Sequence, residues 1–236
     1  MEANASRSAR ARVREELAKE ILDAARGRLA VEGPAGLSLR AVARDLGMVP
    51  SALYRYYESR DALLTALIIE AYRGLGERAE AADRSVPPDD LPKRWFATTG
   101  AIRDWGLTHP QEWALIFGSP VPGYRAPQET NAVAATVYAS LGRLLGDAWR
   151  AGRLHPPPVT IPADLRVDLS SIGETVVGEA PDEVAVAAVV ALGHLLGAMS
   201  LELFGQYNNA IFARDALWQI RMELAARAAG LDLPPR

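Results

Sequence analysis

Apolar residues recur at the helical period along almost the whole chain, and this pattern limits the fold more than any other feature. Between residues 13 and 29 they fall three or four positions apart, as on one face of an amphipathic helix. Gly33-Pro34 ends this run, because glycine caps a helix and proline cannot continue one. The sequence contains no run of alternating apolar and polar residues, which is the pattern typical of a strand. The sequence therefore predicts an all-α fold.

Glycine, proline and serine divide the rest of the chain into further predicted helices. Ser38 is a candidate N-cap for a short helix that Gly47 ends, and Pro50 suits the first position of the next one. Ser59 opens a long helix, which stops before the breaker at 86–90. The remaining helices are expected near 91–108, 110–117, 127–152, 163–177, 181–205 and 210–229.

The charge is distributed unevenly along the chain. The net charge of −3 argues against a nucleic-acid partner, because DNA binding depends on Lys and Arg beside phosphates. Residues 1–60, however, carry 11 Lys and Arg against 8 Asp and Glu, a net of +3. Such asymmetry is typical of a polyanion-binding end on an acidic body. The sequence has no cysteine, which excludes disulfides and thiol chemistry. The first 30 residues are charged throughout and do not resemble a signal peptide, so we expect a cytoplasmic protein.

Two short helices around Gly47 have the dimensions of a helix-turn-helix. In that motif the second helix places its first residues in the major groove, while the first helix braces against the DNA backbone. Gly47 tolerates the positive φ that the turn needs. Pro50, Ser51 and Ala52 are small enough for the exposed start of the second helix, whose Leu53, Tyr54 and Tyr57 are expected to point inward.

The stretch from Leu37 to Leu63 resembles the tetracycline-repressor (TetR) family. Leu53 to Leu63 matches that family's pattern of Leu-Tyr, an aromatic pair, a basic residue and a leucine, and the likeness is strong over about residues 12–75. The resemblance implies a three-helix DNA-binding domain at 12–58 and a larger helical ligand-binding and dimerisation domain at 59–236. By position, the implied DNA-contacting residues are Ser38, Arg40, Pro50, Ser51, Ala52, Tyr54, Arg55, Tyr56 and Arg60.

Residues 1–11 form a predicted basic arm ahead of this domain. Arg7, Arg10, Arg12 and Arg14 fall within eight positions. Two interpretations stay open: a solvated tail, or an arm that reaches phosphates or the minor groove.

The segment from Val184 to Leu201 is apolar enough to resemble a membrane span. Its Ala, Val and Gly content, and the Glu202 that follows at once, favour a fully buried bundle helix and no membrane. The resemblance to the TetR family implies a homodimer through the helices near 181–205 and 210–229. Two copies would then read a palindromic operator in double-stranded DNA.

Aromatic residues gather in the middle of the chain, and Trp105 to Tyr124 resembles a C-terminal domain type named for a Trp-His-Gly motif. Aromatic cavities suit apolar effectors, although each of these rings taken alone is more typical of ordinary core. The candidate pocket residues are Trp105, His109, Trp113, Phe117, Tyr138, Trp149 and His194.

These observations predict a ligand-responsive transcriptional regulator, a repressor that a small effector of unknown identity releases from DNA. The alternative from another class is a small helical enzyme or carrier that uses the aromatic cavity. Common catalytic motifs and metal-ligand spacings are missing from the sequence, so no cofactor, metal site or catalytic residue is predicted. A third possibility is a helical adaptor that binds only protein.

Overall fold

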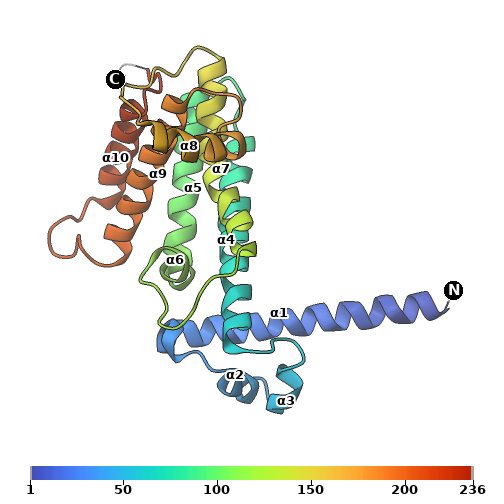
Figure 1. Ribbon diagram of the computed structural model, residues 1–236. Coiled ribbons are helices and arrows are strands. Elements are labelled where there is room, and N and C mark those ends of the chain that lie inside the picture. The colour runs from blue at the N-terminus through green and yellow to red at the C-terminus, as the bar shows by residue number, and fades with distance from the viewer. Residues whose placement is uncertain (1, 235–236) are drawn as a thin grey trace. The chain divides into compact units, whose positions relative to one another are not determined.

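A computed structural model describes residues 2–234, and within them the side chains of residues 11–170, 173 and 176–234. Over this range the chain is helical, with one isolated β-bridge between Leu154 and Leu231 and no strand, which confirms the all-α prediction (Figure 1). The helices are α1 Glu2–Gly36, α2 Leu39–Asp45, α3 Pro50–Leu53, α4 Arg60–Arg84, α5 Leu91–Thr108, α6 Pro110–Phe117, α7 Glu129–Arg150, α8 Ala163–Val176, α9 Asp182–Leu203 and α10 Arg214–Ala228.

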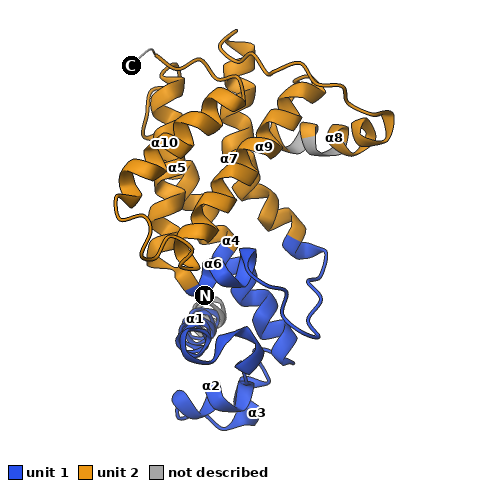
Figure 2. Ribbon diagram, turned by 90° about the vertical axis from the view of Figure 1, so that its left-hand side faces the viewer, with its two compact units in different colours: residues 1–71, 111–130 blue, residues 72–110, 131–236 orange. Residues whose placement is uncertain are grey.

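The helices form two compact units, residues 1–71 with 111–130 and residues 72–110 with 131–236 (Figure 2). The first unit therefore extends past residue 58, where the sequence placed the end of the DNA-binding domain. Two side-chain contacts hold the additional segment 111–130 in this unit. The hydroxyls of Thr65 and Tyr124 are 2.9 Å apart, and Arg26 Nε lies 3.4 Å from a carboxylate oxygen of Glu112.

The first helix begins earlier than the sequence indicated. Residues 2–11 belong to α1, so the predicted separate arm is a continuation of this helix. The side chains of Arg7 and Arg10 lie outside those described. At the other end, Gly33 has φ 67° and breaks the helical geometry, as its place before Pro34 predicted.

The core of the first unit joins the first three helices to the start of α4. Its fully buried side chains include Ile21, Ala25, Val42, Leu53 and Leu63. Ser59 caps α4, because its Oγ accepts a hydrogen bond from the N–H of Ala62 at 3.0 Å. The hydroxyl of Ser38 precedes α2 as predicted, but among the described residues it makes no capping hydrogen bond.

The turn between α2 and α3 depends on Gly47, whose φ is 64°. Replacing Gly47 by alanine is expected to lower the free energy of unfolding by about 1–2 kcal/mol, because a Cβ disfavours this left-handed conformation. Gly27 is a matched control, since it lies exposed in α1 with open space where a Cβ would stand. Gly27→Ala is expected to stabilise by about 0.5–1 kcal/mol. Urea denaturation measures both, and equal effects of the two substitutions would contradict this account of the turn.

Two buried arginines connect the helices of the second unit. Arg94 of α5 bonds to Asp83 of α4 at 2.8 Å and to Asp147 of α7 at 2.9 Å. Arg103, also in α5, forms a two-pronged bond to Glu202 of α9 at 2.8 and 2.9 Å. Hydrogen bonds between an arginine and a carboxylate are directional, so these pairs restrict the orientation of α5 relative to its neighbouring helices.

The apolar helix α9 is long and hydrophobic enough to span a membrane by length and composition alone, with a mean hydropathy of 2.1. In this structure one side of α9 packs against α5, α8 and α10. The opposite side exposes Val189, Val190, His194 and Leu201. The prediction of a fully buried helix is therefore wrong, because the neighbouring helices of the same chain cover one face only.

Candidate nucleic-acid interface

The backbone of the turn sets the direction of the second helix of the motif. The N–H groups of Gly47 and Met48 bond to the carbonyls of Arg44 and Ala43 at 3.1 and 2.8 Å, which closes the end of α2. Val49 is extended, and α3 then begins at Pro50 as predicted. The geometry is that of a helix-turn-helix with a short second helix.

Burial divides α3 and the residues after it into a core side and an exposed side. Leu53 is fully buried and anchors the helix, while Pro50, Ser51 and Arg55 are exposed. Ala52 and Tyr56 are half-buried. The side chains at the start of α3 are small, so this surface can approach the edges of bases closely.

Two tyrosines differ from the expected inward orientation. Tyr54 is 46% exposed and belongs to the outer surface, which agrees with the role that the family resemblance implied and contradicts the inward one. Tyr57 is only half-buried, and this burial raises the pKa of its hydroxyl. Of the three residues expected to point inward, Leu53 alone is fully buried.

Positive side chains outnumber negative ones on the exposed parts of α2 and of the residues just after α3. Arg40, Arg44 and Arg55 are exposed. The carboxylate of Asp45 is held by Arg28 at 2.6 and 2.7 Å, and these hydrogen bonds lower its pKa. Arg44 was not among the predicted contacts, although its four-residue spacing from Arg40 on one helix was the available signal.

Arg60, predicted to contact a phosphate, has hydrogen-bond partners within its own unit. Its guanidinium donates hydrogen bonds to the carbonyls of Pro34 at 2.7 Å and Leu37 at 3.2 Å. It therefore ties the start of α4 to the chain between α1 and α2. These bonds use Nε and Nη2, while Nη1 lies 3.5 Å from a carboxylate oxygen of Asp61, so the phosphate contact of Arg60 stays a prediction.

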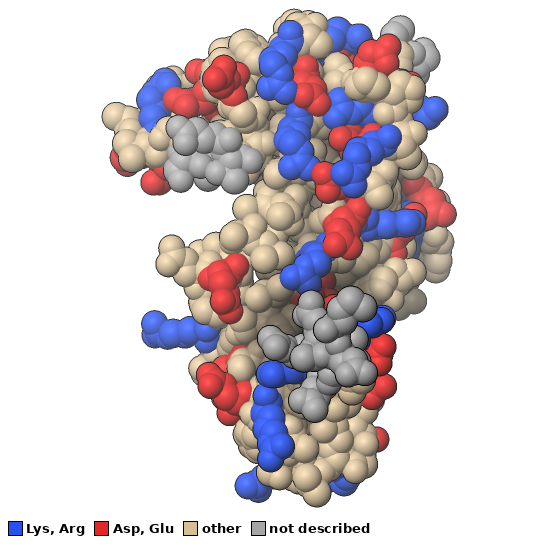
Figure 3. All heavy atoms as spheres, turned by 90° about the vertical axis from the view of Figure 1, so that its right-hand side faces the viewer, with Lys and Arg blue, Asp and Glu red and all other residues tan. Residues whose placement is uncertain are grey.

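The face shown in Figure 3 carries Lys and Arg side chains interspersed with Asp and Glu, without one continuous patch of a single sign. Long-range attraction alone does not single out a binding surface on this face. DNA binding is therefore inferred from the local geometry of α2, the turn and α3.

The seven candidate pocket residues are divided between the two units. In the second unit, the rings of Trp105 and His109 stack at 4.9 Å, with His109 Nδ1 3.0 Å from the Trp105 carbonyl oxygen. In the first unit, Trp113 and Phe117 lie 4.6 Å apart. Trp113 is fully buried and thus part of the core.

The other three pocket candidates lie in the second unit and differ in exposure. Tyr138 is half-buried beside Tyr72, and burial together with Tyr138 raises the pKa of Tyr72 to about 12. Trp149 and His194 are exposed. The structure thus pairs four of the seven residues and places two of the remaining three at the surface of their unit.

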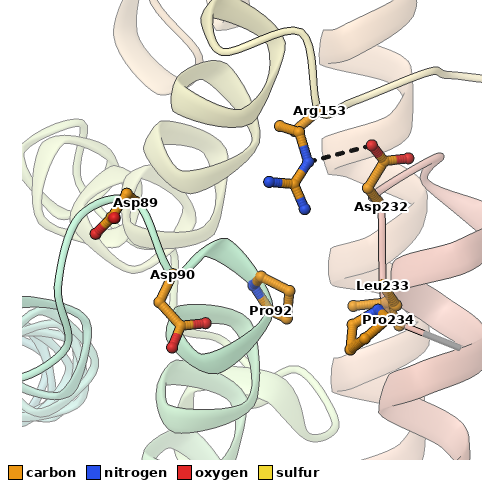
Figure 4. A pocket seen from close by; sticks show the side chains of 7 residues that line it. All are labelled: Asp89, Asp90, Pro92, Arg153, Asp232, Leu233 and Pro234. Atoms are coloured by element: carbon orange, nitrogen blue, oxygen red, sulfur yellow. Dashed lines mark hydrogen bonds and ion pairs between the residues drawn. The ribbon is translucent and has the colours of Figure 1, made fainter. Parts of the chain in front are cut away.

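A cavity of about 610 Å³ lies in the second unit, near the C-terminal end (Figure 4). Its lining residues are Asp89, Asp90, Pro92, Arg153, Asp232, Leu233 and Pro234. Two of the three carboxylates have partners within the chain: Asp90 accepts a hydrogen bond from the N–H of Lys93, and Asp232 pairs with Arg153 at 3.2 Å. This cavity contains none of the aromatic and histidine candidates, and its polar lining differs from the apolar site expected for the effector.

A helical head with an exposed helix-turn-helix, followed by a larger helical unit, defines the class of helix-turn-helix DNA-binding regulators. Comparison with family models agrees with this class. Residues 21–67 match the model described as bacterial regulatory proteins, tetR family, and residues 95–225 match the tetracyclin repressor-like C-terminal domain. The chain belongs to the TetR family of transcriptional regulators.

Individual relatives extend the likeness over most of the chain. The HTH-type transcriptional regulator Rv1816 of Mycobacterium tuberculosis is 37% identical over 196 residues, which are 83% of this chain and 84% of that protein. The solved structure of the putative regulatory protein SCO4313 is 34% identical, with a TM-score of 0.73 and coverage of 91% of this chain and 97% of the other. A protein of unknown function from Rhodococcus sp. RHA1 shares the fold at 23% identity, with a TM-score of 0.70 and coverage of 91% and 95%. The Trp-His-Gly subtype of the C-terminal domain stays a prediction.

Proposed function

We propose that the chain is a homodimeric repressor that occupies a palindromic operator and leaves it when a small apolar effector binds the second unit. The exposed, small-residue start of α3, held by Leu53 beneath it, carries this proposal. A ligand that prefers a conformation with mismatched heads would shift the population away from the DNA-bound state. A regulator of this family works on DNA, so we expect the protein in the cytoplasm. The proposed regulation requires no catalysis.

Selection of bound duplexes from random DNA supplies the operator for a direct test. Transcription in vitro from a promoter that contains the recovered sequence is expected to fall when the purified protein is added. An increase in transcript would contradict repression while leaving DNA binding intact. Turnover of a small molecule by the purified protein would instead favour the enzyme alternative.

The exposed sides of α9 and α10 support the proposed dimer. Val189, Val190 and Leu201 of α9 and Ile220 and Leu224 of α10 are all exposed large apolar residues. An uncovered apolar surface of this kind is typical of a protein–protein contact. Self-association would bury it, and a pair of heads would bind DNA with the contacts of two half-sites.

A charge in this apolar surface is expected to separate the protomers. Val190 is 44% exposed in α9, and Val190→Glu would place carboxylates at the proposed contact between the two copies. Light scattering after gel filtration is expected to give the monomer mass for the variant and the dimer mass for the unmodified protein. Val31→Glu is the control, because Val31 is 85% exposed at the end of α1. A dimer mass for Val190→Glu would place the contact elsewhere.

An apolar effector is supported by the stacked rings of Trp105 and His109 and by the half-buried Tyr72 and Tyr138, all of which belong to the second unit. A fluorescent apolar anion, 1-anilinonaphthalene-8-sulfonate, is a suitable first probe. We expect saturable binding that weakens in Tyr138→Ala, since rings and hydroxyls orient such ligands. Binding equal in the variant and the unmodified protein would exclude Tyr138 from the site.

A further inference from the structure

The arginine cluster at the start of α1 has no role in the proposed contacts of α2 and α3. Arg14 is the member of this cluster whose contact is best defined. Its guanidinium carbon lies 5.7 Å from the centre of the Tyr56 ring, a cation–π arrangement. Tyr56 lies three residues after the end of α3, so Arg14 lies at the edge of the candidate interface.

The helical register places Arg14 on the side of α1 that faces the rest of its unit. Ile21 and Ala25 are fully buried and define this side, and Arg14 precedes Ile21 by seven residues, or nearly two turns. Arg7 and Arg10 precede Arg14 by seven and four residues in the same helix, which is the spacing of one helical face. Their side chains lie outside those described, and only their positions in the register are used.

The acidic residues of this segment fall on other sides of the helix. At about 100° per residue, Glu15, Glu16 and Glu20 lie roughly 100–240° around the axis from Arg14. Arg12 and Lys19 share that side. The segment is nearly neutral in total charge, but its register separates a face of arginines from a face of mixed sign.

We propose that the N-terminal part of α1 extends the DNA interface onto phosphates that flank the half-site read by α3. This inference rests on the proposed function and names an additional part of its DNA partner. Figures 1 and 2 place α2 and α3 on the same side of α1, and Figure 1 shows that α1 runs on beyond them toward its N-terminal end. The positions of Arg7, Arg10 and Arg14 span about 10 Å along the helix, the length of about three phosphates on one strand.

The chemistry of this contact is independent of the base sequence. A guanidinium binds phosphate oxygens through two parallel hydrogen bonds, and such contacts fix the position of a protein on DNA without reading bases. Because the segment is helical, its arginines keep a fixed spacing, unlike those of a flexible arm. The flanking contact therefore lengthens the footprint on the duplex and leaves the recognition sequence unchanged.

Two duplexes test this inference with the full chain and the operator recovered by selection. The shorter duplex ends at the outer edge of each half-site, and the longer one adds about one helical turn, 10 bp, on each side. Arg10→Ala/Arg14→Ala removes two charges from the arginine face. Arg12→Ala/Lys19→Ala removes two charges from the other side of the same helix. Circular dichroism verifies that all the proteins are folded.

The unmodified protein and the Arg12→Ala/Lys19→Ala control are expected to bind the longer duplex more tightly than the shorter one. Arg10→Ala/Arg14→Ala is expected to lose most of the gain in affinity that the longer duplex gives. On the longer duplex, the salt dependence of its affinity should also fall by about 2 per head, at about 0.9 for each phosphate that an arginine no longer neutralises.

Equal binding of the two duplexes by the unmodified protein would overturn the inference. A variant that loses the same factor on both duplexes and keeps the gain from the flanks would overturn it too, and would limit Arg14 to holding Tyr56. Failure of the unmodified protein to bind either duplex would remove the proposed function itself, and this inference with it.

Discussion

Replacing Arg103 by alanine is expected to lower the free energy of unfolding by about 3–5 kcal/mol, because it leaves the buried carboxylate of Glu202 without its partner. Arg103 and Glu202 are both buried, and hydrogen bonding to Glu202 raises the pKa of the guanidinium. The second acidic partner, Asp215, is 93% exposed at its side chain and contributes little. The Trp218 ring lies 5.4 Å from the guanidinium carbon, and alanine would remove this interaction as well.

Urea denaturation followed by circular dichroism measures this loss. Arg227→Ala is the matched control, since Arg227 pairs with Glu223 one turn away on the surface of α10 and such pairs contribute about 0.3–0.5 kcal/mol. The double substitution Arg103→Met/Glu202→Met is expected to recover much of the stability, because no charge is left buried and unpaired. A loss below about 1 kcal/mol in Arg103→Ala would show that Glu202 reaches water or another partner.

Removing the exposed side chains just after α3 is expected to abolish most specific DNA binding. Tyr54→Ala/Arg55→Ala should weaken operator binding by at least about tenfold, because one good contact contributes about 1–3 kcal/mol and a dimer presents each residue twice. Both residues are exposed, so the variant should keep the unfolding transition of the unmodified protein. Fluorescence anisotropy with a labelled duplex measures the affinity.

Arg150→Ala serves as the control for loss of an exposed positive charge, because Arg150 lies at the end of α7 in the second unit. Arg60 is unsuitable for this purpose, since its removal would release the carbonyls of Pro34 and Leu37. Unchanged operator affinity in Tyr54→Ala/Arg55→Ala would show that the interface lies elsewhere on the head.

The local structure was predictable where short stretches of sequence determine it. Gly33, Gly47, Pro50 and Ser59 mark helix ends through backbone conformation or capping, and these effects act within a few residues. The same applies to the breaker at 86–90. For this reason the predicted helix bounds are close to those of the structure after residue 30.

The missed features depend on contacts between distant parts of the chain. Arg60 finds its carbonyl partners more than twenty positions earlier, and Arg103 meets Glu202 ninety-nine positions later. Helical periodicity shows that α9 is apolar, but it does not show which face its neighbours leave exposed. Tyr54 was ambiguous for the same reason, because an amphipathic tyrosine suits a core edge and a surface equally.

The pocket was the least predictable part of the site. The same aromatic residues occur in cores and in ligand sites, so the sequence does not distinguish Trp113 from Trp149 as pocket candidates. The structure distinguishes them, because Trp113 is fully buried and Trp149 is exposed. The cavity near Asp232 is polar and is formed by loops and chain ends, which no periodicity marks.

Binding of the unmodified protein to duplexes selected from random DNA, measured against salt concentration, tests the central claim most directly. We expect enrichment of one palindromic sequence, with an affinity that falls steeply as salt increases because phosphate contacts release counterions. A duplex with one scrambled half-site is expected to bind more weakly. Selection without any enriched sequence, or association that is insensitive to salt, would contradict the assignment of α2, the turn and α3 as a DNA-reading surface.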